Sequence, residues 1–503
     1  MNNIYMVFFD LGLNKGGITS AVLNRSRYFY KNGYPADIVT FDYKYNSSKV
    51  VKELKKSGKM YSETKLFNMF DFFESRSLVT HSEKNQFLYD YYDHLLNESL
   101  CIVQDEKISR YFSKTTGEYL LYKKGNFETG NYVLDRFENN QRKERVYYRK
   151  NVLKRIKEYD YKNRLISERF FDELGFPFLR RNINRETGKV GKIYLLTDNK
   201  QFENSSELCS YFLSELIEDR SENIIICDGP GSFPKILAAG FTYVKKYAFI
   251  YTNHINVRNK EKNKETYILK NGDQLDGVIV LTESQKNDII RDYNLNNVSA
   301  ISNFIEIPDV VNKPNNDSKK IVGMVSRLVE NKGFVYLIEV AKIVTSIYSN
   351  VSFNIYGEGE YRSRVEELIQ ENGLENNFKL MGYTNDPNKA ISEFDCVVST
   401  SQIEGQGLSI IEAMLQQKPV VVFNVRYGPS DFIKHEQNGI LIENKYTEKM
   451  ANDIIYLLEN EETAKKMGKQ AREDIIKQYR PEMIMQQWEK YLIYSEISLN
   501  RLN

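Results

Sequence analysis

The stretch that decides the fold is NIYMVFFDLGLNKGGITSAVLNRSRYFYKNGYPADIVTFDY, residues 3–43. YMVFFD is typical of a buried strand, SAVLNRSRYFYKNG of an amphipathic helix that Gly33 closes, and ADIVTFD of a second strand. A strand, a helix and another strand in this order predict a parallel sheet with helices on both faces. The N-terminal part of the chain is therefore expected to be α/β.

A second α/β region follows a polar, turn-rich joint at residues 307–320. Strand-like segments alternate with helical ones: KIVGMVSRL, VSFNIYGEGE, NFKLMGYTND, DCVVSTSQ and KPVVVFNV. This alternation predicts a second Rossmann-like domain at 319–485, followed by a C-terminal helix at 486–503. Because ligands of open α/β sheets bind at the carboxyl ends of the strands, the site residues are expected in the loops that follow these strands.

Residues 81–200 have a different pattern. Segments such as EYLLYKKGN, NYVLDRFENN and RVYYRK are rich in Tyr, Val and Arg, and Gly or Asn stands at the turns between them. Such a pattern is typical of an antiparallel meander. We therefore predict two Rossmann-like domains facing a cleft, with an antiparallel β domain inserted at 81–200 between the two parts, 1–80 and 201–310, of the N-terminal one.

Composition narrows the function. The four cysteines and four histidines of the 503 residues show no metal-ligand spacing, and no D-x-D triplet is present, so a site without a metal or cofactor is expected. The apolar run near the N-terminus is too short for a signal peptide, and no run approaches the roughly 18 residues of a membrane span. The sequence therefore predicts a cytoplasmic protein, one that could sit peripherally at the inner face of the membrane.

Positive charge is concentrated between residues 141 and 200. This stretch holds 17 Lys and Arg against 8 Asp and Glu, a local excess of nine, although the net charge of the chain is only +2. Such a stretch can be an ordinary solvated surface or a surface that binds a polyanion, and both interpretations stay open. The residues that we single out for polyanion contact are Arg142, Lys143, Arg145, Arg149 and Lys150.

Two loops could bind phosphate. NKGG, residues 14–17, joins the first strand to its helix, and glycine lets a backbone approach a ligand closely. SRLVENKG places Arg327 and Lys332 after the first strand of the second α/β region, where two cations can hold a diphosphate. A common glycine turn and two ordinary surface cations are the alternatives for these loops taken singly.

Two glutamates, Glu404 and Glu412, have seven residues between them in STSQIEGQGLSIIEAML, residues 399–415. The first lies in a glycine loop after a buried strand, and the second lies in the early turns of an apolar helix. Helix capping alone could explain Glu412. Helix amides, one carboxylate for vicinal hydroxyls and a second carboxylate nearby nevertheless favour a nucleotide-sugar site.

This segment resembles the E-x7-E motif of the retaining GT-B glycosyltransferases of family 4. Arg327 and Lys332 match the diphosphate clamp of that family, NKGG its glycine loop, and TNH with His254 its histidine facing the donor sugar; GEG and YGPSDFI fit as well. The sequences ADIVTFDYK, ICDGPGSFPK and VSTSQIEGQGLS, together with the insertion, are similar to the wall teichoic acid α-glycosyltransferases. The resemblance covers essentially the whole chain.

The resemblance implies a role for each motif. Glu412 would bind the ribose hydroxyls of UDP, and Glu404 would contact the donor sugar near its 3- and 4-hydroxyls. Arg327 and Lys332 would stabilise the departing β-phosphate, as in other preorganised electrostatic sites. The further donor contacts that it implies are Gly16, Gly17, His254, Tyr383, Gly407, Leu408 and Ser409.

The resemblance also implies the partners. The enzyme would move an α-linked sugar from a UDP-sugar to a polyanionic teichoic acid, and it would associate as a trimer through the inserted domain. We expect glucose and poly(glycerol-phosphate), with N-acetylglucosamine and poly(ribitol-phosphate) as the alternative. A sugar-nucleotide epimerase and an inactive scaffold are more remote alternatives, and no nucleic acid or transmembrane segment is expected.

Overall fold

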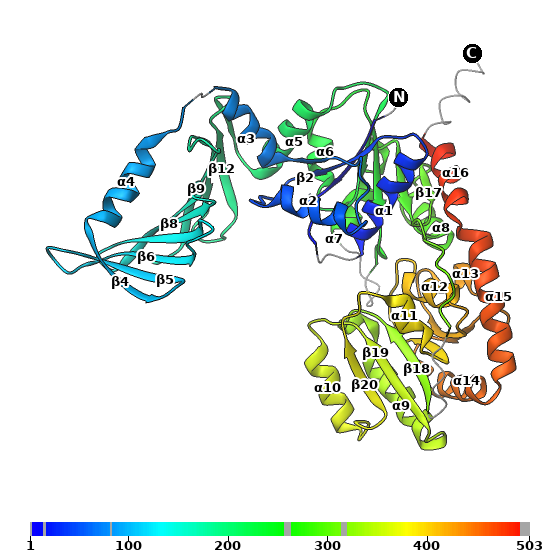
Figure 1. The fold of residues 1–503 in the computed structure, drawn as a ribbon. Coiled ribbons are helices and arrows are strands. Elements are labelled where there is room, and N and C mark those ends of the chain that lie inside the picture. Colours follow the sequence, from blue (N-terminus) through cyan, green and yellow to red (C-terminus); the bar gives the residue numbers. More distant parts are fainter. Residues whose placement is uncertain (1–2, 14–16, 81–82, 256–262, 313–318, 493–503) are drawn as a thin grey trace, which may run out of the picture. The chain divides into compact units, whose positions relative to one another are not determined.

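The computed structural model describes residues 3–13, 17–80, 83–255, 263–312 and 319–492 (Figure 1). The chain forms two compact units. The first contains Met1–Thr19, Tyr34–Cys227 and Gly231–Lys245, and the second contains Ser20–Gly33, Asp228–Pro230 and Lys246–Asn503. These units are divided differently from the domains expected from the sequence, whose boundaries stay predictions.

The first unit contains four parallel strands in the order β14-β1-β2-β3. Their bounds are β1 Asn3–Phe8, β2 Ala36–Thr40, β3 Leu66–Asn68 and β14 Asn223–Cys227. The helices of this part are α2 Ser47–Lys56, α3 Met69–Thr80, α5 Ser205–Leu216 and α6 Phe233–Ala238. Every residue of β14 is buried, which explains its continuous apolar sequence. Strand β1 ends at Phe8, two residues before the predicted end.

The same unit carries a ten-stranded antiparallel sheet in the order β13-β12-β11-β10-β9-β8-β7-β6-β5-β4. Its strands are β4 Ser99–Asp105, β5 Ile108–Ser113, β6 Tyr119–Asn126, β7 Asn131–Glu138, β8 Gln141–Arg149, β9 Val152–Tyr159, β10 Leu165–Phe171, β11 Pro177–Ile183, β12 Val190–Leu195 and β13 Lys200–Phe202. Each strand follows its neighbour through a short turn, as the alternating pattern predicted. The expected inserted antiparallel β region is therefore confirmed.

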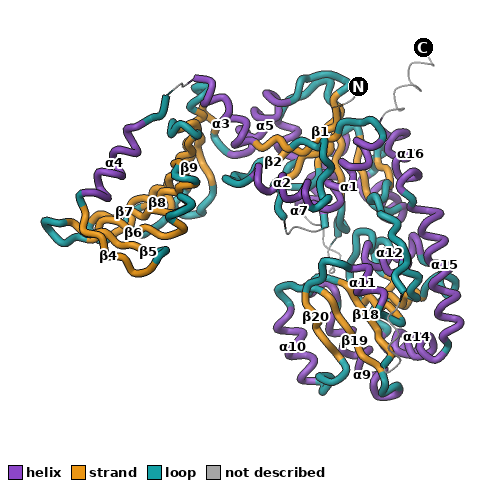
Figure 2. Tube along the Cα trace, in the orientation of Figure 1, coloured by secondary structure: helices purple, strands orange, loops and turns teal. Residues whose placement is uncertain are grey.

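The two faces of this sheet differ. Helix α4 (Gln86–Asn97) runs along one face, where Tyr92 packs against Leu121, Leu134, Val146 and other buried side chains (Figure 2). The opposite face carries a row of paired positions, Asp135, Arg145, Lys157, Glu168 and Arg181 on β7 to β11. Alternation along each strand therefore separates an apolar face from a charged one.

The second unit contains helix α1 (Ile18–Lys31) from Ser20 onward, and it also contains three parallel strands. The strands are β15 Lys245–Ile250, β16 Gly277–Val280 and β17 Val298–Ala300, and the helices are α7 Asn263–Lys270, α8 Glu283–Tyr293 and α16 Pro481–Leu492. Trp488 of α16 is fully buried and packs edge-on against Phe29 of α1, at 5.3 Å between ring centroids. The C-terminal helix is thus part of the core of this unit.

A six-stranded parallel sheet in the order β20-β19-β18-β21-β22-β23 completes the second unit. The strands are β18 Lys320–Val325, β19 Val351–Tyr356, β20 Phe378–Gly382, β21 Cys396–Ser399, β22 Val420–Asn424 and β23 Ile440–Glu443. The helices are α9 Phe334–Ile347, α10 Arg362–Glu371, α11 Pro387–Ser392, α12 Leu408–Leu415, α13 Pro429–Phe432, α14 Thr447–Glu459 and α15 Glu461–Tyr479. Helices α9, α10 and α14 share one apolar core with the strands. The predicted Rossmann-like alternation is confirmed here.

Two further observations concern the chain as a whole. In the ranges that the structure describes, no helix is both long and apolar enough to cross a membrane. All four cysteines are free, and Cys209, Cys227 and Cys396 are buried while Cys101 is exposed.

Candidate functional site

Two loops meet at the carboxyl edge of the six-stranded sheet. The loop after β18 carries Arg327 and Lys332, and the loop after the neighbouring strand β21 carries Glu404. Backbone contacts join them: the Gln402 amide donates to the Asn331 carbonyl at 2.8 Å, and the Thr400 hydroxyl donates to the Lys332 carbonyl at 3.1 Å. Parallel neighbours thus bring together residues that are far apart in the sequence.

Gly333 makes this approach possible. Its φ is +69°, and a Cβ placed there would lie 2.1 Å from the Thr400 carbonyl oxygen. Any other residue would clash with the second loop, so glycine is required for close contact. The residue before it, Lys332, is thereby held at the junction.

Lys332 and Glu404 form an ion pair in which the ammonium group donates to Oε1, and only 16% and 12% of their side chains are exposed. Arg327 is exposed, and no ion pair joins it to another described residue. The expected clamp of two cations therefore consists of one paired lysine and one arginine open to solvent.

Helix α12 points its N-terminus at the same edge. Gly407, at φ +87°, precedes the helix, and the amides of Ile410 and Ile411 donate to its carbonyl at 3.0 and 3.2 Å. The amides of Leu408 and Ser409 come before these bonds, among the donors that a helix leaves unsatisfied. Together with the helix dipole they favour an anion, which supports the predicted phosphate contact.

Glu412 lies one turn further along α12 and is partly buried. Burial raises the pKa of its carboxyl from 4.5 to about 7. Within the described ranges no hydrogen bond reaches this carboxylate from another side chain. A carboxylate that is costly to ionise would gain from donation by ligand hydroxyls, which favours a ligand contact over simple helix capping.

Tyr383, one of the expected donor contacts, follows β20 and is 69% exposed. The Gly357 amide donates to the Gly382 carbonyl at 2.8 Å, which places Tyr383 beside the GEG loop. An exposed aromatic ring in this position is available for stacking on a base.

His254 is buried, unlike a freely exposed sugar contact. Its ring is parallel to that of Tyr427 at 6.1 Å between centroids, and the Tyr293 ring lies edge-on at 6.0 Å. A Cβ on Gly405, the residue after Glu404, would lie 2.1 Å from the Tyr251 carbonyl, so the His254 segment touches the Glu404 loop. Gly17, at φ +60°, belongs to the first unit, and Gly16 lies outside the described residues.

The sequence did not indicate a buried polar network behind the His254 segment. Arg25 of α1 pairs with Asp228, and the Tyr251 hydroxyl donates to the same carboxylate at 2.6 Å. The guanidinium group also lies 4.9 Å from the Phe249 ring centroid. Because this network fixes Tyr251, it positions the residues that follow. Its one sequence signal was the aspartate at the end of the strand NIIICD.

The five predicted polymer contacts occupy β8 and the turn after it, in the first unit. Arg145 makes a two-pronged pair with Asp135 at 2.6 and 2.7 Å, and Arg142 approaches the same carboxylate at 3.5 Å. Arg149 lies 4.0 Å above the Tyr45 ring centroid. Lys143 is partly exposed, and Lys150 is exposed with φ +51°. Two of the five cations thus approach the Asp135 carboxylate, one lies over an aromatic ring, and the two lysines are partly or fully exposed.

We call the carboxyl edge of the six-stranded sheet, with Arg327, Lys332, Glu404 and the N-terminus of α12, the donor edge. Its side chains are suited to particular parts of a ligand. A guanidinium group, an ammonium group and helix amides suit a diphosphate, and a carboxylate to which no described side chain donates suits vicinal hydroxyls. No cluster of three or more His, Cys, Asp or Glu suited to a metal ion occurs in the part of the chain that the structure describes.

Comparison with known proteins shows the family of this chain. The family profile "Glycosyl transferases group 1" matches residues 307–474. The chain is 43% identical over 493 residues to the poly(ribitol-phosphate) alpha-N-acetylglucosaminyltransferase of Staphylococcus aureus strain COL, which covers 97% of this chain and 99% of that protein. It is 25% identical over 501 residues to the poly(glycerol-phosphate) alpha-glucosyltransferase of Bacillus subtilis strain 168, covering 95% and 73%.

A solved structure agrees with these sequence relationships. The crystal structure of a variant of S. aureus TarM in complex with fondaparinux, α-GlcNAc-glycerol and UDP superposes with a TM-score of 0.91. The two chains are 42% identical, over 98% of this chain and all 100% of that one. The fold is therefore GT-B, as expected. The chain belongs to the wall teichoic acid α-glycosyltransferases, a group of UDP-sugar-dependent retaining enzymes.

Proposed function

We propose that the chain transfers α-linked N-acetylglucosamine from UDP-N-acetylglucosamine to poly(ribitol-phosphate) teichoic acid. The observation that carries the proposal is the identity of 43% to the ribitol enzyme, against 25% to the glycerol enzyme, over nearly the whole chain. The preference for glucose and poly(glycerol-phosphate) that we drew from the sequence is the less supported one and is corrected here. Divergence in detail from the ribitol enzymes was a weak argument, since loop residues vary widely among homologues.

The donor edge would bind UDP-N-acetylglucosamine in the following way. Arg327 and the α12 amides bind the diphosphate. Glu412 accepts hydrogen bonds from the ribose hydroxyls, and uracil stacks on Tyr383. Lys332 then contacts both the β-phosphate and Glu404. Its contact with Glu404 orients that carboxylate toward the sugar hydroxyls. The Lys332–Glu404 ion pair supports this reading, because it puts a phosphate contact and a sugar contact side by side.

We propose that transfer in this arrangement retains the anomeric configuration, as the resemblance implies. The acceptor hydroxyl oxygen attacks the anomeric carbon from the face that the diphosphate leaves, and the bond between that carbon and the β-phosphate oxygen breaks. The leaving phosphate oxygen takes the hydroxyl proton, so the protein supplies neither a nucleophile nor a base. Its contribution is stabilisation of the charge on the diphosphate, which is often the largest catalytic effect. We propose that this chemistry needs no metal ion.

The polymer would lie on the charged face of the ten-stranded sheet. Arg142, Lys143, Arg145, Arg149 and Lys150 are its proposed contacts, and Arg149 adds an aromatic neighbour, Tyr45. Phosphate groups at regular spacing suit a face where guanidinium and ammonium groups recur on successive strands. Synthesis of the acceptor at the inner membrane surface would also explain a cytoplasmic, peripheral location.

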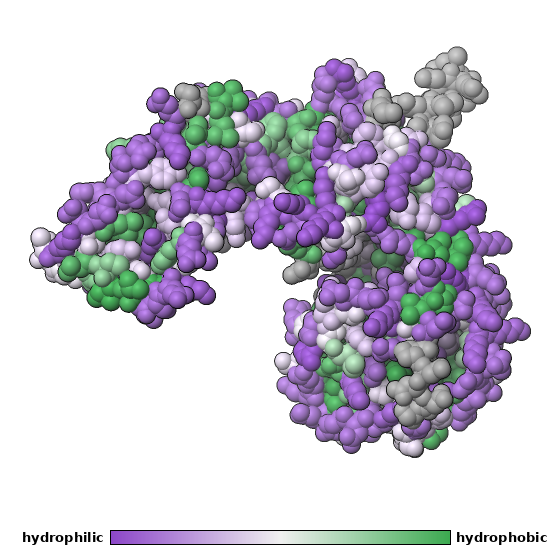
Figure 3. Space-filling view, in the orientation of Figure 1, coloured by the Kyte–Doolittle hydropathy of each residue, from purple (hydrophilic) through white to green (hydrophobic). Residues whose placement is uncertain are grey.

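Self-association would use the outer edge of the same sheet. Strand β4 is the last strand of the sheet, and Leu100, Ile102 and Val103 on it are 54%, 59% and 67% exposed. Figure 3 shows the apolar patch at this end of the inserted region. An unpaired apolar edge strand tends to pair with another chain, so we propose that copies associate here, as a trimer. Light scattering of the native chain and of Ile102→Lys tests this step.

The activity is tested with two donors and two acceptors. UDP-N-acetylglucosamine and UDP-glucose are each incubated with poly(ribitol-phosphate) and poly(glycerol-phosphate), and UDP release and polymer mass are measured. The expected result is the highest kcat/KM for N-acetylglucosamine on the ribitol polymer. Highest activity with glucose on the glycerol polymer would reverse the assignment. Epimerised UDP-sugar without transfer would indicate an epimerase, and no reaction by a folded protein would indicate a scaffold.

A further inference from the structure

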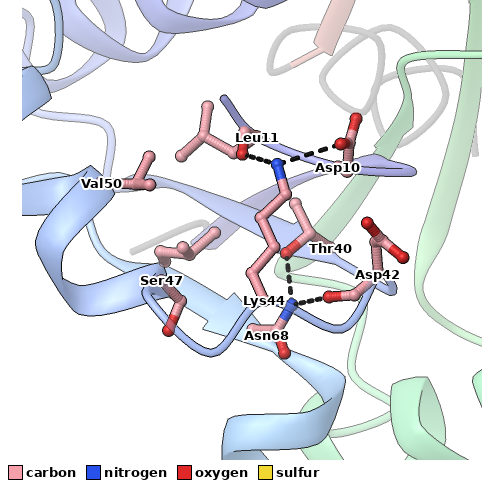
Figure 4. Close-up of a pocket in the computed structure, with 9 residues that line it drawn as sticks. Asp10, Leu11, Thr40, Asp42, Lys44, Ser47, Val50 and Asn68 are labelled. Atoms are coloured by element: carbon pink, nitrogen blue, oxygen red, sulfur yellow. Dashed lines mark hydrogen bonds and ion pairs between the residues drawn. The ribbon is translucent and has the colours of Figure 1, made fainter. Parts of the chain in front are cut away.

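A small cavity lies at the carboxyl edge of β1, β2 and β3 in the first unit (Figure 4). Three of its lining residues are ionisable: Asp10 after β1, and Asp42 and Lys44 after β2. Thr40, Ser47 and Asn68 supply polar atoms, while Leu11, Val50 and Leu66 close it with apolar ones. The ends of parallel strands are where α/β proteins bind ligands, and the donor site has no share in these residues.

The cavity is shaped by hydrogen bonds rather than by loose side chains. Asn68 Nδ2 donates to Thr40 Oγ1 at 3.0 Å and to the Asp42 carbonyl at 2.8 Å. The Lys44 ammonium donates to the Leu11 carbonyl and pairs with Asp10 at 3.0 Å. An ammonium group has three N–H donors, and these two partners use two of them. The wall is therefore rigid and still has a donor to offer.

Asp42 offers the matching acceptor. Its amide donates to the Phe9 carbonyl at 3.2 Å, which fixes the backbone. Burial, reinforced by the nearby charge of Asp10, raises the pKa of its carboxyl above the ordinary value of 3.8 despite the opposing effect of Lys44. Donation from a hydroxyl would stabilise this carboxylate. A hydroxyl is the smallest group that can both donate to Asp42 and accept from Lys44.

The size of the cavity excludes more than one such group. Its volume is about 10 Å³, which is room for a single water-sized occupant. The side chains of Lys44 and Asp10 are 23% and 16% exposed, so the occupant can enter from solvent. A whole polyol does not fit, whereas one of its hydroxyl groups does.

The loop that carries Asp42 and Lys44 also contacts the charged face of the inserted sheet. The Arg155 guanidinium lies 5.4 Å from the Tyr43 ring centroid, and Arg149 lies 4.0 Å from that of Tyr45. The Arg181 cation acts on the Asp42 carboxyl as well. A phosphate polymer on that face would thus run directly onto this loop.

We propose that Asp42 and Lys44 bind one non-reacting hydroxyl of the acceptor polyol and thereby select ribitol phosphate over glycerol phosphate. The inference rests on the proposed function, since it concerns the acceptor of that reaction. A glycerol unit linked through its two ends has one free hydroxyl, which the reaction itself uses. A ribitol unit linked in the same way has three, so a second hydroxyl remains for the cavity. Sites that hydrogen-bond a substrate hydroxyl discriminate strongly against analogues without it.

The test compares acceptors. Wild-type protein, Asp42→Asn and Lys44→Met are assayed with UDP-N-acetylglucosamine and either polymer, and the ratio of the two kcat/KM values is determined. Loss of a hydrogen bond to a charged group is expected to lower the ribitol activity about 10- to 100-fold. Activity on the glycerol polymer should change much less, so the ratio of kcat/KM for the ribitol polymer to that for the glycerol polymer should fall. The KM for the donor and the slow release of UDP without acceptor should stay unchanged.

Controls separate this role from a structural one. Lys49→Met removes a lysine from helix α2, whose side chain is 72% exposed, and should leave the ratio unaltered. A defect in folding would lower both activities and the melting temperature, and Lys44→Arg then tests whether a cation restores the ratio. An unchanged ratio in Asp42→Asn and Lys44→Met overturns the inference while the proposed function stands. Failure of the wild-type protein to use poly(ribitol-phosphate) overturns the proposed function instead.

Discussion

The donor edge of the six-stranded sheet and the charged face of the ten-stranded sheet both concentrate positive charge, but they do so differently. At the donor edge the Lys332–Glu404 ion pair lies in the same two loops as Arg327, which forms no ion pair among the described residues, and a helix N-terminus points to this edge. On the charged face the cations largely alternate with carboxylates, as Arg145 does with Asp135. The first arrangement concentrates the field at one point, whereas the second spreads it over many strands.

This difference predicts unequal sensitivity to mutation. A group that stabilises charge developing in the transition state affects the rate by orders of magnitude. Exposed ion pairs and solvated cations each contribute little, because water and salt screen them. Single substitutions should therefore damage the donor edge and leave the charged face nearly intact.

The largest effect is expected for Arg327→Ala. Loss of one preorganised contact to the leaving diphosphate should lower kcat/KM about 10²- to 10³-fold, measured as UDP release with saturating polymer. The matched control is Lys342→Ala on helix α9, an exposed lysine whose loss should not alter the rate. Equal rates for the two variants would show that Arg327 does not face the diphosphate.

The two glutamates should separate binding from turnover. Glu412→Ala removes the proposed ribose contact and should weaken UDP binding about 10- to 100-fold by calorimetry. Glu404→Ala should instead lower kcat more than it weakens UDP binding, because this carboxylate is proposed to face the sugar. Normal transfer by both variants would contradict the assigned site.

The strand alternation and the site loops could be predicted because each depends on local patterns. Buried parallel strands have continuous apolar sequences, and the glycines at 333 and 407 mark turns at their ends. The pairing of Lys332 with Glu404 could not be predicted. The two residues are 72 positions apart, and only the order of the strands in the sheet brings them together. The cavity lined by Asp10, Asp42 and Lys44 was missed for the same reason: each residue alone is an ordinary polar strand end.

The charged residues of the inserted region also have partners that the sequence alone did not predict. Composition gave a local excess of nine positive charges, yet only the register of β7 against β8 places Asp135 opposite Arg145. His254 was expected at the sugar, but its packing against Tyr427 depends on tertiary contacts that a single sequence does not reveal. Local sequence thus indicates which groups are present, whereas their partners depend on the fold.

A smaller effect is expected from pH. The pKa of the Glu412 carboxyl is raised from 4.5 to about 7, so the group is mostly protonated at pH 6 and mostly ionised at pH 8. Ribose hydroxyls donate to the ionised form, and binding should therefore strengthen as the pH rises and level off above about 7. Uridine, which has no phosphate to titrate, should bind about tenfold more tightly at pH 8 than at pH 6. Glu412→Gln should remove this dependence, and a wild-type affinity that is constant with pH would contradict it.

The smallest effect is expected on the charged face. Lys143→Gln combined with Lys150→Gln removes two cations without leaving a known partner, and it should weaken polymer binding only about two- to fivefold at low salt. The loss should vanish at high salt, and UDP binding should not change. Arg142→Gln combined with Arg145→Gln removes the same charge but leaves the buried Asp135 carboxylate without its cations, so it should also lower the melting temperature. If the two double variants have the same melting temperature, the ion pairs on this face contribute no more to stability than its solvated lysines do. If neither weakens polymer binding, the polymer lies elsewhere, and the distributed charge of the sheet serves only its solubility.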